Sequence, residues 1–239
     1  MSNYEVLAFS SAEELAKAAA REWLGALERS VPQTKYSVAL SGGRIARQFF
    51  SAVVEWAKLK KILWDNIHFF WGDERCVPPS DPESNFAIAH DLLLHPLGIP
   101  DNQVHRIRGE DSPELSAKNA SLDLCSFSSS SSSSAAPILD LIFLGMGEDG
   151  HVASLFPGEP EGVISNPAIY RAVTATKPPP RRITLGYSTI AAAREVWVLA
   201  SGPGKKDALQ QSFSPSGQTP LAHVIRLRSN TRIFSDIRL

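Results

Sequence analysis

Residues 138–157 place the tightest constraint on the fold of this chain. The segment begins with a nearly continuous apolar run, Ile138–Leu144, which is typical of a strand buried on both faces of a parallel sheet. Glycine allows a sharp turn and the close approach of a ligand, and open α/β sheets carry ligand sites at the carboxyl ends of their strands. The turn after this strand combines glycines with ionisable side chains: Gly145, Gly147, Glu148, Asp149, Gly150 and His151. The segment therefore predicts a site here, and a solvated tight turn is the alternative.

A second strand, Tyr36–Leu40, leads into Ser41-Gly42-Gly43-Arg44, where a helix is predicted to begin. Backbone amides and the positive end of a helix attract anions, and Ser41 adds a hydroxyl and Arg44 a charge. The Gly-Lys-Ser/Thr ending of a Walker loop is absent. The turn predicts a phosphate cradle, with a glycine-rich connection that binds nothing as the alternative.

Glu195–Ala200 is another apolar strand that ends in small residues, Ser201–Gly204, before Lys205 and Lys206 open a helix. The construction again suits an anion, although lysines on a helix are often merely solvated. Three prolines precede a further basic pair, Arg181 and Arg182, in an extended segment.

The strand Ile67–Trp71 runs into Gly72 and then Asp73, Glu74 and Arg75. Charged groups at the carboxyl end of a strand indicate substrate contact, and a surface ion-pair cluster is the plainer interpretation.

Composition narrows the classes of function. The chain has 239 residues, a net charge of -1 and 21% charged residues, so it lacks the basic excess that is typical of nucleic-acid-binding proteins. Any anion-binding site must therefore be formed by a local group of residues. Cys76 and Cys125 form neither a disulfide framework nor a zinc spacing, which favours a reducing cytoplasmic location. We expect no signal peptide and no membrane-spanning run.

The remaining pattern predicts one domain, residues 1–239. A helix over Pro113–Cys125 is predicted to turn Leu115, Leu122 and Leu124 inward. The serine run that follows predicts a flexible surface loop at 126–136, because serine buries no apolar area. Further strands are expected on both sides of this loop in one sheet: Tyr4–Phe9, Tyr170–Thr176 and Thr231–Phe234.

Taken in order, the motifs resemble the glucosamine-6-phosphate isomerase/6-phosphogluconolactonase family, and its lactonase branch in particular. The resemblance covers nearly the whole chain and is carried by SGGR at 41–44, GDERCVP at 72–78, LGMGEDGHVASLFP at 144–157, KPPPRRITL at 177–185 and SGPGKKDAL at 201–209. It implies an α/β fold: a doubly wound, mostly parallel sheet with helices on both faces, like that of glucosamine-6-phosphate deaminase. One departure is Ile45-Ala46, where many members of the family have Thr-Pro.

The implied activity is hydrolysis of 6-phospho-D-glucono-1,5-lactone to 6-phosphogluconate, the second step of the oxidative pentose phosphate pathway. A neutral histidine suits a general base near neutral pH, so we expect His151 to activate water. We expect Asp149 to hold the histidine ring or a water in place, and Arg75 to stabilise the alkoxide. The phosphate is expected on the amides of Gly42 and Gly43, with Arg44, Lys205 and Arg182 as the cations. The other expected substrate contacts are Ser41, Asp73, Glu74 and Gly147.

No histidine spacing predicts a metal site, so no metal or organic cofactor is expected. The expected partner is a phosphorylated sugar lactone, with no nucleic acid or membrane, for a monomer or weak homodimer. A glucosamine-6-phosphate deaminase and a non-catalytic sugar-phosphate sensor are the alternatives. The deaminase segments resemble Asp-Glu-Tyr and Gly-x-Asn-Gly-His, whereas this chain has Asp-Glu-Arg at 73–75 and Glu-Asp-Gly-His at 148–151, which favours the lactonase.

Overall fold

The computed structural model describes residues 3–29, 35–60, 62–128 and 137–239. Within these residues the strands form a six-stranded parallel sheet, in the order β1-β9-β8-β5-β2-β3, and a three-stranded antiparallel sheet, in the order β4-β7-β6. The strands are β1 (Glu5–Ala8), β2 (Tyr36–Leu40), β3 (Ile67–Trp71), β4 (Asp73–Arg75), β5 (Leu141–Gly145), β6 (Tyr170–Thr174), β7 (Arg181–Leu185), β8 (Glu195–Ala200) and β9 (Arg232–Ser235).

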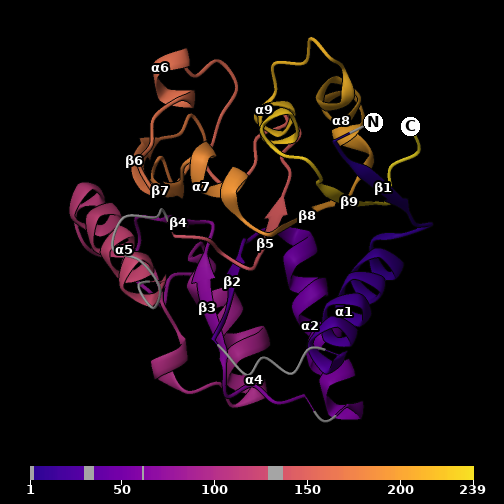
Figure 1. Cartoon of the computed structure of the whole chain (residues 1–239), viewed down its shortest axis with the longest axis vertical. Helices are drawn as coiled ribbons and strands as arrows, with labels where there is room; N and C mark the ends of the chain where they lie inside the picture. The colour runs from indigo at the N-terminus through magenta and orange to yellow at the C-terminus, as the bar shows by residue number, and fades with distance from the viewer. Residues whose placement is uncertain (1–2, 30–34, 61, 129–136) are drawn as a thin grey trace.

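Helices lie on both sides of the large sheet, as the resemblance implied. Figure 1 shows α1 and α2 on one side of β8 and β9, and α8 and α9 on the other. The helices are α1 (Ala12–Arg29), α2 (Arg44–Leu59), α3 (Asn85–Ala89), η1 (His90–Leu94), α4 (His95–Leu97), η2 (Asp101–Gln103), α5 (Pro113–Ser128), α6 (Glu161–Ile164), α7 (Tyr187–Ala192), η3 (Pro203–Lys205), α8 (Lys206–Phe213) and α9 (Pro220–Leu227).

Aromatic side chains fill the layer between the large sheet and α1 and α2. Phe143 of β5 packs against Phe49 of α2 at 4.5 Å and Trp23 of α1 at 5.3 Å between ring centroids. All three rings are buried, as expected for strands and helices whose apolar faces meet in one core. This packing fixes the helices whose first turns approach the site.

The topology places a crevice between β2 and β5. The chain moves outward from β2 to β3 on one side, and from β5 to β8 and β9 on the other, so the strand order reverses between β2 and β5. Ligands of open α/β sheets bind at such a switch point, outside the carboxyl ends of the strands. The turns after Leu40 and Gly145 lie at this point, as the sequence predicts.

The small sheet is attached directly to the end of β3. Gly72 follows β3, and its carbonyl accepts a hydrogen bond of 2.8 Å from the amide of Leu185 in β7. The Tyr170 hydroxyl of β6 donates to the Trp71 carbonyl at 2.8 Å. β4 and β7 are therefore held over the carboxyl ends of the parallel strands.

Several predicted boundaries need correction. The central strand begins at Leu141, and Ile138, which the sequence placed in the buried run, is 48% exposed. Residues 126–128 of the predicted loop are helical, since α5 continues through Ser128; the rest of the predicted loop, residues 129–136, lies outside the described residues. In α5, Leu124 is buried, but Leu115 and Leu122 are 49% and 56% exposed, because only one narrow side of α5 faces β6 and β7. Among the described helices, none combines the length and apolar character needed to span a bilayer.

Candidate active site

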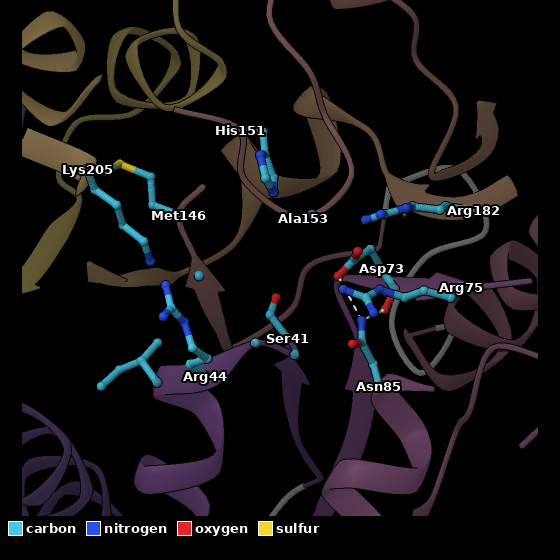
Figure 2. A pocket seen from close by; sticks show the side chains of 14 residues that line it. Ser41, Arg44, Asp73, Arg75, Asn85, Met146, His151, Ala153, Arg182 and Lys205 are labelled. Carbon is cyan, nitrogen blue, oxygen red and sulfur yellow. Dashed lines mark hydrogen bonds between the residues drawn. The ribbon is translucent and has the colours of Figure 1, made fainter. Parts of the chain in front are cut away.

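A cavity opens at the switch point, between the large sheet and the small one. Figure 2 shows Arg44 and Lys205 at one end, Arg75 and Arg182 at the other, and His151 and Ser41 between them. Its lining comes from six separate segments of the chain: Ser41, Gly42, Gly43, Arg44, Ile45, Asp73, Arg75, Asn85, Gly145, Met146, His151, Ala153, Arg182 and Lys205.

The turn after β2 is shaped by its two glycines. Gly43, at the N-cap of α2, has a φ of 100°, a left-handed conformation that glycine adopts without strain. A Cβ on Gly42 would lie 1.9 Å from Oδ1 of Asn85, so a side chain there would collide with the wall of the cavity. The start of α2 therefore reaches the cavity with its backbone exposed to a ligand.

Arg44 and Lys205 form a cation pair that lines both this cavity and a neighbouring one that contains Glu148. Burial and the nearby Arg44 guanidinium lower the pKa of Lys205, while Asp236 and Glu148 oppose this shift. Holding two cations together at a cavity wall is unfavourable unless an anion joins them. This end of the cavity is therefore suited to phosphate.

His151 projects from the turn after β5, and Asp149 holds its ring. Nδ1 of His151 lies 2.5 Å from Oδ1 of Asp149. Burial acts to raise the pKa of Asp149, but hydrogen bonds and charge from His151 prevail, so the pKa lies below its ordinary value. An ionised Asp149 accepts the proton on Nδ1, which leaves Nε2 of His151 as the basic nitrogen.

Gly147 supports this pair without lining the cavity. A Cβ at this position would lie 2.0 Å from Nδ1 of His151 and 2.7 Å from Oδ1 of Asp149. The Gly147 amide also donates to the His151 carbonyl at 2.9 Å, which closes the turn. The structure therefore places Gly147 behind the histidine, where only glycine leaves room for the ring.

The three charged side chains of β4 lie on different faces of the strand. Successive side chains of a strand point to opposite faces, so Asp73 and Arg75 share the face that lines the cavity. Glu74 points the other way and is 2% exposed. Its carboxylate accepts hydrogen bonds from the amides of Arg75, Asn85 and Phe86. Burial raises its pKa to about 6, and these amides counteract part of that rise. Glu74 is therefore not among the residues that line the cavity, and its carboxylate holds the start of α3.

Asp73 is fixed by two residues that sequence reasoning did not select. Ser154 donates from Oγ to Oδ2 of Asp73 at 2.7 Å, and Asn85 donates from Nδ2 to its Oδ1 at 3.2 Å. Asn85 lines the cavity and follows Ser84, the N-cap of α3. A polar residue one position after a helix cap does not by itself indicate a place in a binding site. Asn85 reaches the cavity only because β4 lies beside α3 in the fold.

Arg182 belongs to the same wall as Arg75. The two residues are direct cross-strand partners in the β4–β7 pairing, so their side chains lie on one face. This position separates Arg182 from the phosphate loop with which the sequence associated it. Ser41, Gly42, Gly43, Arg44, Asp73, Arg75, His151 and Lys205 line the cavity, and Asp149 stands behind His151.

Comparison with known proteins places the chain in a family. Residues 10–234 match the family model described as glucosamine-6-phosphate isomerases/6-phosphogluconolactonase. The chain belongs to this family. A 6-phosphogluconolactonase of Mycobacterium tuberculosis is 37% identical over 205 residues, which are 84% of this chain and 82% of that protein. A 6-phosphogluconolactonase of Treponema pallidum is 38% identical over 189 residues, which are 77% and 75% of the two chains.

Solved structures of the family share the fold. The 6-phosphogluconolactonase from Trypanosoma brucei superposes with a TM-score of 0.82 at 26% identity, covering 98% of this chain and 97% of that one. A monomeric glucosamine-6-phosphate deaminase superposes with a TM-score of 0.81 at 19% identity, covering 98% and 97%, which shows the common fold alone. The prediction of a doubly wound, mostly parallel sheet is confirmed.

Proposed function

We propose that this chain hydrolyses 6-phospho-D-glucono-1,5-lactone to 6-phosphogluconate. The observation that carries the proposal is the order of groups along one cavity: a cation pair, a carboxylate-held histidine, and a second pair of arginines. A sugar lactone with a phosphate at its far end presents groups in the same order: a phosphate for the cation pair, and a carbonyl for the histidine and the arginines. Membership of a family whose relatives are 6-phosphogluconolactonases supports the same substrate.

In the proposed mechanism the phosphate lies at the start of α2, between Arg44 and Lys205, with the amides of Gly42 and Gly43 as donors. The lactone carbonyl then lies near His151. Nε2 of His151 removes a proton from water as the water oxygen attacks the carbonyl carbon, and Asp149 stabilises the imidazolium that forms.

The negative charge that develops on the carbonyl oxygen is stabilised by Arg75. The bond from the carbonyl carbon to the ring oxygen then breaks, and the ring oxygen takes the proton from Nε2. The carboxylic acid that forms loses its proton to solvent, so the product is an open chain with a carboxylate at one end and the phosphate at the other.

Among the residues that the structure describes, no three His, Cys, Asp or Glu side chains gather in a way that would hold a metal ion. The absence of a cofactor requirement stays a prediction, as do the cytosolic location and the monomer or weak homodimer.

The decisive experiment assays one purified sample for two products. We expect acid release from the phosphorylated lactone above the uncatalysed rate, and no ammonia from glucosamine 6-phosphate. Ammonia release without lactone hydrolysis would favour a deaminase, and binding of 6-phosphogluconate without either reaction would favour a sensor.

A further inference from the structure

We propose that Arg75 and Arg182 form a second anion subsite, which binds the carboxylate produced when the lactone ring opens. The inference rests on the proposed function. It reassigns Arg182 from the phosphate end of the substrate to the reacting end. The ligands that such a cavity favours are open-chain sugar acids with a phosphate on the far carbon.

The backbone brings the two arginines together. Arg75 in β4 and Arg182 in β7 are directly opposed residues of an antiparallel ladder, in which like charges directly opposite each other are destabilising. Both side chains line the cavity, and Figure 2 shows both guanidinium groups on the wall that also carries Asp73. An arrangement that is unfavourable in the empty cavity becomes favourable when an anion lies between the guanidinium groups.

Each guanidinium is held from outside the cavity. Arg182 donates from Nε to the Pro179 carbonyl at 2.9 Å and from Nη2 to the Lys177 carbonyl at 3.3 Å. Arg75 donates from Nη1 to the Glu83 carbonyl at 2.9 Å. Within the described part of the chain, Nε of Arg75 is buried and has no hydrogen-bond partner. The two groups are therefore oriented in advance, with donors left over for a ligand.

Among the residues that line the cavity, this wall carries two guanidinium groups and one carboxylate. Asp73 is the carboxylate beside the two arginines on the cavity face, and its oxygens already accept hydrogen bonds from Ser154 and Asn85. Glu83 binds Arg75 from the solvent side, with a side chain that is 58% exposed. Burial, and then the charge of Arg75, lower the pKa of Arg182, while Asp73 and Glu83 oppose this shift.

The two cation pairs act on different groups of the ligand. The charged groups that affect the pKa of Lys205 are Arg44, Asp236 and Glu148. Those that affect the pKa of Arg182 are a different set: Arg75, Asp73 and Glu83. The lactone carries one anionic group and can use both charges of one pair. The product carries two anionic groups and can use both pairs, so it binds more tightly than a phosphorylated sugar without a carboxylate.

The test is calorimetric titration with 6-phosphogluconate and with glucitol 6-phosphate, which has an alcohol in place of the carboxylate. In the wild-type protein we expect 6-phosphogluconate to bind at least about tenfold more tightly, since charge-assisted hydrogen bonds are strong. Arg182→Gln should remove most of this ratio while changing the affinity for glucitol 6-phosphate about twofold or less. Lys205→Gln is the matched control: it should weaken both ligands by a similar factor and keep the ratio.

A wild-type ratio near one would overturn the proposal, and this measurement needs no variant that might fail to fold. A ratio that Arg182→Gln leaves unchanged would also overturn it. Lactone hydrolysis by the wild-type protein is assayed on the same sample, so failure of the proposed function is seen separately as absence of turnover.

Discussion

At the scale of single residues, the orientation and tautomer of the His151 ring are set by the residues that contact it. Asp149 accepts a hydrogen bond from Nδ1, Phe156 packs 5.1 Å from the ring centroid, and Gly147 gives the ring its space. These contacts fix the tautomer, so that Nε2 is the nitrogen that takes a proton.

We expect His151→Asn to lower kcat by roughly two to four orders of magnitude, because a general base is removed. The affinity for 6-phosphogluconate should change little, since the charged groups at both ends of the cavity remain. Steady-state kinetics and calorimetry measure the two effects. Turnover within a factor of a few of the wild type would show that another group takes the proton.

Arg44→Ala and Lys205→Ala should each raise KM for the phosphorylated lactone and weaken inhibition by inorganic phosphate. Their effect on gluconolactone without a phosphate should be far smaller. Some loss of kcat is expected as well, because binding energy from the phosphate helps to position the reacting carbon. The measurement is kcat/KM on both lactones. Equal losses on the two substrates would mean that these residues act on the ring or on the fold.

At the scale of elements, the turn after β5 depends on tight packing. Gly147→Ala would place a methyl group 2.0 Å from Nδ1 of His151, so the ring must move away from Asp149. We expect a loss of kcat of about tenfold or more, by misplacement of the base, with phosphate inhibition unchanged. The control is Gly162→Ala in α6, where a Cβ has no neighbour within 4 Å. An active Gly147→Ala protein would show that the turn yields without moving the histidine.

A second element, α5, is fastened to the edge strand β3 by titratable groups. Nδ1 of His68 lies 3.0 Å from Nε2 of His105, whose Nδ1 lies 2.9 Å from Oδ2 of Asp123 in α5. Burial, then the charges of His105 and Lys35, lower the pKa of His68 to about 4, while Asp123 opposes this shift. The native state therefore binds fewer protons at His68 than the unfolded chain does between about pH 4 and 6.5, the ordinary pKa of histidine.

Stability should accordingly fall as the pH drops from 6.5 toward 4. Urea unfolding at a series of pH values measures this decline. His68→Gln keeps a hydrogen-bonding group beside His105 but does not titrate, so its decline should be shallower. An equal slope in both proteins would assign the acid sensitivity to other groups.

At the scale of the whole molecule, the two sheets are joined at the site itself. Ser154 bonds to Asp73, and Leu185 bonds to Gly72, so the wall of the cavity is also the junction between the sheets. We expect thermal unfolding to be a single transition, as it is for one domain. Tryptophan fluorescence and far-ultraviolet circular dichroism should give coincident curves. Separate midpoints would contradict the prediction that residues 1–239 form one domain.

The sequence by itself determined the elements and the glycine turns. Apolar runs such as Leu141–Leu144 can only be buried, and the turns at residues 41–44 and 145–151 require glycine or an exposed helix start. Because parallel strands end at one rim, these motifs predicted one shared site. These predictions depend only on the pattern of apolar residues and glycines within each segment, so they need no knowledge of which segments pack together in the fold.

Tertiary structure alone decided which side chains reach the cavity. Asp73, Glu74 and Arg75 look equivalent in sequence, yet the pleat of β4 turns the middle one into the interior. The pairing of Arg75 with Arg182 and the grip of Asn85 on Asp73 depend on strand register and on the placement of α3. Contacts between segments far apart in the chain leave no pattern within either segment, because the partner is chosen by packing of the whole fold.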